Sequence, residues 1–190
     1  METEVRQLAE FSQFEELYHV HLAQDFSSRE LRPLSSIQRL WEQGRYLCFC
    51  LYGDETLLAY ACFYRRGSDY LFDYLAVVEE YRGRGLGSCF LRQLRDRIAD
   101  ASCVLCEIED PEKAGSEEER AARLRRQAFY ERLGFMVTEV SSRVFGIEYR
   151  VLEYPTGTEH GKAEIEALYT SFYRDLFLPP IFGCCFRITS

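Results

Sequence analysis

The sequence has no run approaching the roughly 20 apolar residues that a membrane-spanning helix requires. Its first ten residues carry four ionisable side chains and no apolar core, unlike a secretion signal. Basic charge is also scarce, since 23 Lys and Arg stand against 31 Asp and Glu, and no basic stripe dominates. These absences argue against a membrane-bound, secreted or nucleic-acid-binding protein, and we expect a cytoplasmic location.

Paired zinc-ribbon motifs are missing as well, although the chain has eight cysteines. Cys103 and Cys106 form a single C-x-x-C, and no second pair stands at zinc-ribbon spacing. We therefore expect reduced, mostly buried thiols that pack as small hydrophobic groups, and no metal site. The histidines, His19, His21 and His160, are expected at the surface.

Apolar residues, in contrast, are plentiful. They make up 47% of the 190 residues, and aromatic residues 15%, so a sizeable core can form and wholesale disorder is excluded. The net charge of −8 would favour a cationic small substrate such as an amine.

Hydrophobic patterning predicts alternating strands and helices. Two strand-like segments flank turn residues 53–56, which indicates a hairpin, and a third strand extends it into an antiparallel meander. Ser116 and Glu119 fit a capping box that begins a helix, and Gly134 fits its end. The other predicted helices are 11–26, 33–43, 86–98 and 159–177, and the predicted strands are 3–8, 45–52, 57–64, 70–78, 103–108, 135–140 and 143–152.

This order of elements predicts an α/β fold of the mixed α+β kind, with one mostly antiparallel central sheet flanked by helices. We assign residues 1–152 to a single domain. Residues 153–190 are expected to form a helical extension packed on the same domain, ending in an apolar tail through Pro179 and Pro180.

The most informative segment joins an apolar strand to a helix through Gly83, Gly85 and Gly87. Three glycines let successive backbone N–H groups turn toward one point without Cβ obstruction. Together with the N–H groups of the helix start, they form a nest suited to a pyrophosphate. The Gly-Lys-Ser/Thr ending of a Walker loop is absent, and the G-x-G-x-G spacing after a meander does not fit a dinucleotide-binding fingerprint.

These residues resemble signatures of the GNAT superfamily of N-acetyltransferases. The segment Arg82-Gly-Arg-Gly-Leu-Gly87 matches the family's [QR]-x-x-G-x-[GA] acetyl-CoA motif, and Leu75-Ala76-Val77 matches the end of its fourth strand. Downstream, Phe129-Tyr-Glu-Arg-Leu-Gly-Phe135 looks like a second signature, a helix ending in Tyr-x-x-x-Gly-Phe. The resemblance covers about residues 3–152, which would make that segment a GNAT domain.

The resemblance implies acetyl-CoA as cosubstrate, in a cleft where the fourth and fifth strands splay apart. Pantetheine would pair with the backbone near Leu75, Ala76 and Val77. Arg82 would shape the loop, and Arg84 would contact a phosphate. The pyrophosphate would accept N–H bonds from Gly83, Arg84, Gly85, Leu86, Gly87 and Ser88.

The resemblance also implies direct attack of a neutral amine on the thioester in a ternary complex, with Tyr130 as proton donor to the departing thiolate. An alkylamine with a pKa of about 10.4 is protonated at neutral pH, so its proton needs an acceptor. Glu107 and Glu109 share one face of a strand, and Asp73 is a carboxylate within an apolar strand. Some family members carry a catalytic glutamate where Glu107 falls. All three remain candidate bases, and the alternative is that they only line the acceptor cleft while water takes the proton.

Two departures from the family pattern bear on the CoA contacts near this helix and suggest a lid-like acceptor loop. Arg123 stands where the family often carries an asparagine that contacts pantetheine, and the link before its helix is longer and more charged than usual. We favour a small-molecule amine, because a C-terminal helix could cover the open groove that a protein substrate needs. A protein or peptide N-acetyltransferase and a non-catalytic acyl-CoA-sensing module remain alternatives. The C-terminal helix either caps the acceptor site or mediates a homodimer.

Overall fold

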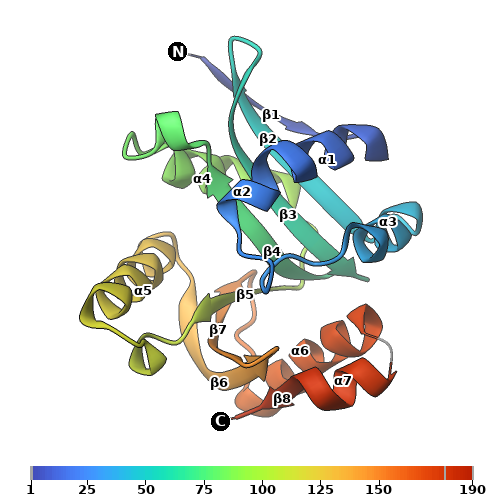
Figure 1. Cartoon of the computed structure of the whole chain (residues 1–190), viewed down its shortest axis with the longest axis vertical. Coiled ribbons are helices and arrows are strands. Elements are labelled where there is room, and N and C mark those ends of the chain that lie inside the picture. Colours follow the sequence, from blue (N-terminus) through green and yellow to red (C-terminus); the bar gives the residue numbers. More distant parts are fainter. Residues whose placement is uncertain (1, 178, 190) are drawn as a thin grey trace. The chain divides into compact units, whose positions relative to one another are not determined.

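The computed structural model describes residues 2–177 and 179–189. Its fold is the predicted mixed α/β class, in which mostly antiparallel strands are flanked by helices (Figure 1). The chain divides into two compact units: unit 1 comprises Met1–Gly67 and Phe72–Ala99, and unit 2 comprises Ser68–Leu71 and Asp100–Ser190. None of the described helices combines the length and apolarity needed to cross a bilayer.

Unit 1 contains the predicted hairpin and meander. The first strand, β1 (Thr3–Gln7), pairs antiparallel with β2 (Tyr46–Gly53), which pairs antiparallel with β3 (Thr56–Arg66). β4 (Asp69–Val77), most of which belongs to this unit, is the neighbour of β3. Positive φ at both Asp54 and Glu55 identifies the β2–β3 connection as a turn whose twist matches that of the strands.

The helices of unit 1 largely follow the predicted ranges. A single helix over 11–26 is predicted, and the structure has three consecutive pieces: α1 (Phe11–Leu17), the π-helical turn η1 (Tyr18–Leu22) and α2 (Ala23–Asp25). α1 and α2 cross one face of the unit 1 strands (Figure 1). α4 packs on β1 and β3. The remaining elements are α3 (Leu34–Glu42), the 3₁₀ turn η2 (Glu79–Tyr81) and α4 (Leu86–Arg97).

Unit 2 has its own set of antiparallel strands. In spatial order these are β5 (Cys103–Glu109), β7 (Ile147–Pro155), β6 (Met136–Val144) and β8 (Phe186–Ile188). α5 (Glu117–Glu131) packs on β5 and β6, whereas α6 (Lys162–Leu176) packs on β6 and β8. A short 3₁₀ turn, η3 (Pro111–Lys113), precedes α5.

The apolar segment after α6 has regular structure, which the sequence analysis did not predict. The chain forms a further helix, α7 (Pro179–Cys185), and then β8, which adds to β6. The ring of Phe186 stacks on that of Tyr173 in α6, with centroids 4.5 Å apart. Burial of this ring against α6 explains why the apolar end of the chain adds a strand to the sheet.

The turn between β6 and β7 also lies elsewhere than predicted. The sequence suggests strands that end and restart around Ser141 and Ser142, but β6 continues to Val144 and the turn is Phe145-Gly146, both at positive φ. Ser142 is buried, and its hydroxyl is hydrogen-bonded to the Tyr169 hydroxyl at 2.9 Å. A polar residue typical of turns is therefore an interior strand residue, because a helix supplies its partner.

Candidate active site

The glycine-rich loop lies in unit 1, between β4 and α4. Gly83 and Gly85 both have φ of 77°, the left-handed region that favours glycine, and Gly85 is the N-cap of α4. A Cβ at either position would meet no protein atom within 4 Å, so the side of the loop that a Cβ would face is open. The first turn of a helix has N–H groups without intrahelical acceptors, so this loop has the geometry of an anion-binding nest.

Arg82 holds this loop in place. Its Nε donates to the carbonyl of Val77 at 2.9 Å, and its guanidinium pairs with the carboxylate of Asp25 at 2.5 Å. Asp25 also accepts a hydrogen bond from Tyr60 at 2.8 Å. Through these two contacts the guanidinium joins the start of the loop to β4 and α2.

Replacing Arg82 by Ala is therefore expected to raise the KM for acetyl-CoA about tenfold, the equivalent of one charged hydrogen bond, with little change in kcat. The matched control is Arg92→Ala, since Arg92 is an exposed arginine of α4 outside the glycine-rich loop. Steady-state kinetics with varied acetyl-CoA measure both effects. An equal increase for Arg92→Ala would contradict the anchoring role of Arg82.

The end of β4 is accessible to a ligand only in part. Leu75, Ala76 and Val77 are half-buried, and the Val77 carbonyl accepts the Arg82 hydrogen bond. Arg84 is exposed, and its guanidinium also lies over the ring of Tyr81, 5.4 Å from the centroid.

Tyr130 lies in the last turn of α5, in unit 2, and its side chain is buried. Burial raises the pKa of its phenol well above the usual range, and the Cys106 thiol, to which the hydroxyl is hydrogen-bonded, raises it further. The Tyr130 ring packs against Phe129 and Phe135 with centroids 5.2 Å apart in each case. A phenol that stays protonated at neutral pH can act as a proton donor. The sequence motif locates Tyr130 but does not identify its thiol partner.

The N-terminus of α5 differs in one bond from the predicted capping box. Ser116 is the N-cap, and its Oγ accepts from the backbone N–H of Glu119 at 3.2 Å. The Glu119 carboxylate, however, accepts from the N–H of Gly115 at 2.6 Å. Gly134, at φ of 95°, follows the helix end as predicted.

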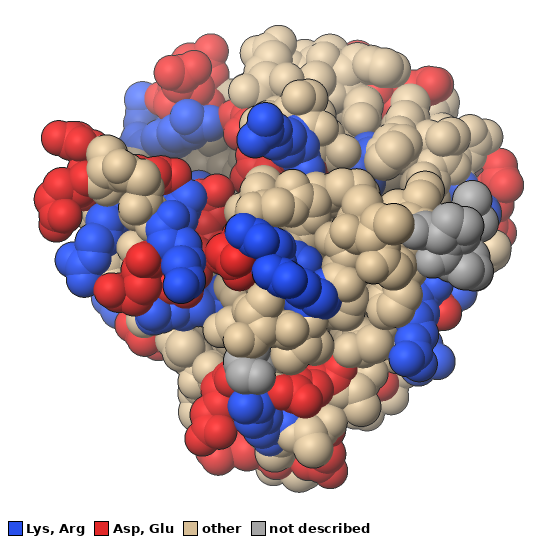
Figure 2. Space-filling model, turned by 60° about the horizontal axis from the view of Figure 1, so that its bottom comes forward, with Lys and Arg blue, Asp and Glu red and all other residues tan. Residues whose placement is uncertain are grey.

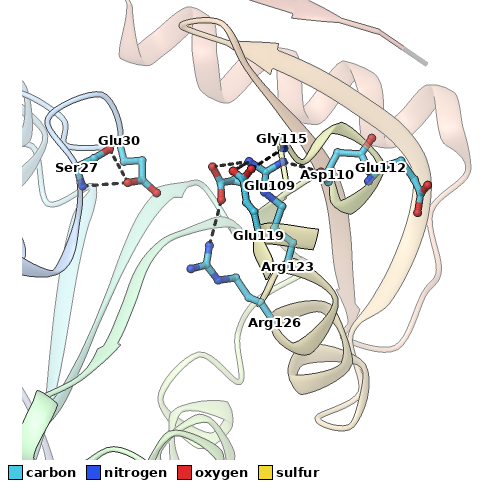
Figure 3. Close-up of polar contacts among 9 residues, drawn as sticks. All are labelled: Ser27, Glu30, Glu109, Asp110, Glu112, Gly115, Glu119, Arg123 and Arg126. Carbon is cyan, nitrogen blue, oxygen red and sulfur yellow. Dashed lines mark hydrogen bonds and ion pairs between the residues drawn. The ribbon is translucent and has the colours of Figure 1, made fainter. Parts of the chain in front are cut away.

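Arg123 links α5 to the segment after β5 (Figure 3). It donates to the carbonyl of Asp110 at 2.8 Å and contacts the carboxylates of Glu119 at 2.5 Å and Glu109 at 3.3 Å. Its Nε is buried without a hydrogen-bond partner in the described part of the chain. The Glu109 carboxylate also lies 3.9 Å from Arg126. The charged stretch before α5 is therefore organised by Arg123, which occupies the position where the family often has asparagine.

The three candidate bases have different partners. Asp73 is buried in unit 1, where it pairs with Arg32 at 2.8 Å and accepts from the Tyr46 hydroxyl at 2.8 Å. In unit 2, the Tyr173 hydroxyl donates a hydrogen bond that is shared between the two carboxylate oxygens of Glu107, at 2.6 and 2.7 Å.

Arginine already contacts the carboxylates of Asp73 and Glu109, whereas Glu107 contacts the neutral hydroxyl of Tyr173. Tyr173 belongs to α6, and sequence reasoning did not find it because it lies 66 residues from Glu107.

All eight cysteines are free thiols and most are buried, as predicted. Cys48 and Cys62 face each other across β2 and β3 with sulfur atoms 3.6 Å apart. His19 is exposed as expected, whereas His21 and His160 are only partly exposed, and His160 also contacts the buried carboxylate of Glu153.

The chain resembles known proteins both in the sequence around the glycine-rich loop and in its fold. Residues 44–137 match the family model described as the acetyltransferase (GNAT) domain, a range that includes the glycine-rich loop and Tyr130. Residues 44–137 therefore form an acetyltransferase domain of the GNAT superfamily. No curated protein sequence matches the chain.

Solved structures of GNAT proteins share the fold. A GNAT-family protein from Bacteroides thetaiotaomicron has a TM-score of 0.73 at 16% identity, covering 90% of this chain and 96% of that chain. The Escherichia coli ribosomal-protein-S18-alanine N-acetyltransferase has a TM-score of 0.61 at 19% identity, covering 85% and 98%. An aminoglycoside 6′-N-acetyltransferase complexed with coenzyme A has a TM-score of 0.59 at 11% identity, covering 83% and 99%. At these identities the likeness shows the fold alone.

Proposed function

We propose that this acyltransferase moves the acetyl group of acetyl-CoA to a primary amine, with a small-molecule amine as the favoured acceptor. The observation that carries the proposal is the loop before α4, where left-handed Gly83 and Gly85 are held by the Arg82 bonds to β4 and α2. Such a loop suits the pyrophosphate of a CoA thioester.

The proposed cosubstrate contacts follow from the same loop. Backbone N–H groups from Gly83 to Ser88 bind the pyrophosphate, and the exposed Arg84 contacts a phosphate. The pantetheine amides pair with the backbone around Leu75 and Ala76, because the carbonyl of Val77 already accepts from Arg82. The known complex of an aminoglycoside acetyltransferase with coenzyme A supports this choice of cosubstrate.

The proposed reaction is direct. The neutral amine attacks the thioester carbonyl carbon, the carbon–sulfur bond breaks, and the departing thiolate takes the proton of the Tyr130 hydroxyl. Burial keeps the pKa of the Tyr130 phenol above its usual range, so the hydroxyl still carries its proton at neutral pH. Glu107 accepts the proton that the amine loses, through a water molecule.

The net charge of this chain and the substrates of proteins with a similar fold support a small cationic acceptor. The net charge is −8, and on the face shown in Figure 2 acidic and basic side chains are interspersed, with uncharged residues over much of its centre and right. One fold relative acetylates aminoglycosides, which are small amines. The likeness to the S18-alanine enzyme makes a protein N-terminus the second candidate acceptor.

A panel of acceptors tests the proposal. The purified chain is incubated with acetyl-CoA and, separately, polyamines, amino sugars, amino acids, aromatic amines and short peptides with free N-termini, while free thiol is measured. Thiol release that depends on one class of small amine supports the proposal. Release with peptides alone favours the second candidate, and tight CoA binding without release for any acceptor favours a sensing module.

Replacing Glu107 by Gln is expected to lower kcat about 10²-fold, because general-base catalysis contributes at least this much, and to leave the KM for acetyl-CoA unchanged. Glu109→Gln is the matched control on the same strand, and we expect a smaller effect because Glu109 contacts Arg123 and Arg126. Steady-state kinetics with the best acceptor compare the two. A larger loss for Glu109→Gln would reassign the base.

A further inference from the structure

Three different kinds of metal ligand meet in unit 2, outside the residues assigned to acetyl transfer. Cys103 begins β5, Glu153 lies near the end of β7, and His160 lies just before α6. One ligand atom of each residue lies within 4.8 Å of the other two. The sequence offers no hint of this cluster, because the three residues do not form a spaced motif.

The cluster is built around a buried carboxylate. Glu153 is 2% exposed and Cys103 is 1% exposed. A buried carboxylate is costly unless it is paired or coordinates a metal. One oxygen of Glu153, Oε1, lies 2.5 Å from His160 Nδ1 and 3.5 Å from Cys103 Sγ. The His160 side chain is 24% exposed, so the cluster can be reached from the surface through this residue.

We propose that Cys103, Glu153 and His160 bind a divalent transition-metal ion of the zinc type through Sγ, Oε1 and Nδ1, with solvent as the fourth ligand. Thiolate, carboxylate and imidazole together form a ligand set that zinc prefers, whereas calcium and magnesium select oxygen ligands alone. A thiol, an imidazole and a carboxylate that share one buried point therefore point to a zinc-like ion.

The distances between the ligand atoms fit a tetrahedral zinc site if the His160 ring moves slightly. Bond lengths of about 2.3 Å to sulfur and about 2.1 Å to oxygen separate these two ligand atoms by about 3.6 Å. The observed separation between Cys103 Sγ and Glu153 Oε1 is 3.5 Å. The same geometry needs about 3.4 Å between nitrogen and oxygen, so the His160 ring moves outward by roughly 1 Å when the ion binds. His160 is the residue of the three that can move, since it is partly exposed and lies outside the strands.

The electrostatic environment also favours a cation. The Glu153 carboxylate lies 3.5 Å from the Cys103 sulfur and 2.5 Å from Nδ1 of His160, so its negative charge faces both of the other ligands. A bound ion would join β5 and β7 to the start of α6. Since α6 carries Tyr173, which is hydrogen-bonded to Glu107, the ion would fix the C-terminal segment to the strand that carries the proposed base.

Cobalt(II) tests the proposal, because a thiolate bound to this ion gives an intense near-ultraviolet charge-transfer absorption. The metal-free full chain is titrated with Co²⁺ and then with Zn²⁺. We expect one Co²⁺ per chain with this absorption, displaced by Zn²⁺. We also expect Zn²⁺ to raise the unfolding temperature.

The variants separate this site from other thiols. Cys103→Ser is expected to abolish the absorption, and His160→Ala to weaken binding at least about tenfold. Cys106→Ser is the matched control, a buried thiol on the same strand, and should retain the absorption; its loss there would overturn the assignment. If Cys103→Ser does not fold, the metal affinity of His160→Ala tests the proposal alone, because His160 is partly exposed and its replacement should be tolerated. Absence of thiolate absorption in the wild type, absorption that survives Cys103→Ser, or unchanged affinity in His160→Ala overturns the proposal.

Discussion

Replacing Tyr130 by Phe should lower kcat about 10²-fold, while acetyl-CoA should still bind with its original affinity. The variant removes a buried hydroxyl and keeps the ring that packs against Phe129 and Phe135. Without this proton donor the CoA thiolate leaves unassisted, and the loss corresponds to the usual contribution of general-acid catalysis. Steady-state kinetics give kcat, and calorimetry gives the affinity for acetyl-CoA.

The control is Tyr154→Phe, since the Tyr154 ring lies 5.2 Å from that of Phe135 in the same aromatic cluster. This variant also removes one hydroxyl from the cluster, and its kcat should match the wild type. If the two variants lose activity equally, the effect is one of packing. If Tyr130→Phe keeps its turnover, Tyr130 is not the acid.

Replacing Gly85 by Val should abolish acetyl-CoA binding without unfolding the chain. The left-handed backbone at Gly85 makes any side chain unfavourable by about 1–2 kcal/mol, which a folded domain tolerates. No protein atom lies within 4 Å of the new Cβ, so the isopropyl group projects from the open side of the loop. The pyrophosphate would then meet this group, and calorimetry should detect no binding.

Gly67→Val is the matched control for this variant. Gly67 also has a left-handed backbone, with φ of 64°, and a Cβ there would meet no protein atom within 4 Å, but the residue lies in the turn before β4. Its substitution introduces similar strain and should leave acetyl-CoA binding unchanged. Equal loss of binding in both variants would mean general destabilisation, and native affinity in Gly85→Val would show that the loop does not bind the pyrophosphate.

Local patterns predicted most of the fold. The β2–β3 hairpin follows from apolar runs around residues 53–56, and the start of α4 follows from a glycine-rich loop. The loop and Tyr130 were found because their motifs lie within short, continuous segments. The predicted position of the β6–β7 turn was wrong. Both Ser141-Ser142 and Phe145-Gly146 are possible turn sites, and the turn forms at Phe145-Gly146.

Partners that are distant in sequence could not be predicted. The Asp73 carboxylate pairs with Arg32, 41 residues away, and Glu107 accepts a hydrogen bond from Tyr173, 66 residues away. Nothing in the composition of either strand selects these partners, because tertiary packing brings them together. For the same reason the buried contact of Glu153 with His160 was missed.

The stoichiometry of acetyl transfer tests directly whether the acetyl group passes from acetyl-CoA to the amine in one step. With the acceptor that gives the fastest thiol release, mass spectrometry measures the acetylated amine, the released CoA and any acetylated protein during turnover. Direct attack predicts one acetylated amine for each CoA released, and no acetyl group on the protein. CoA release without acetylated amine, or an acetyl group carried by the protein during turnover, would contradict it.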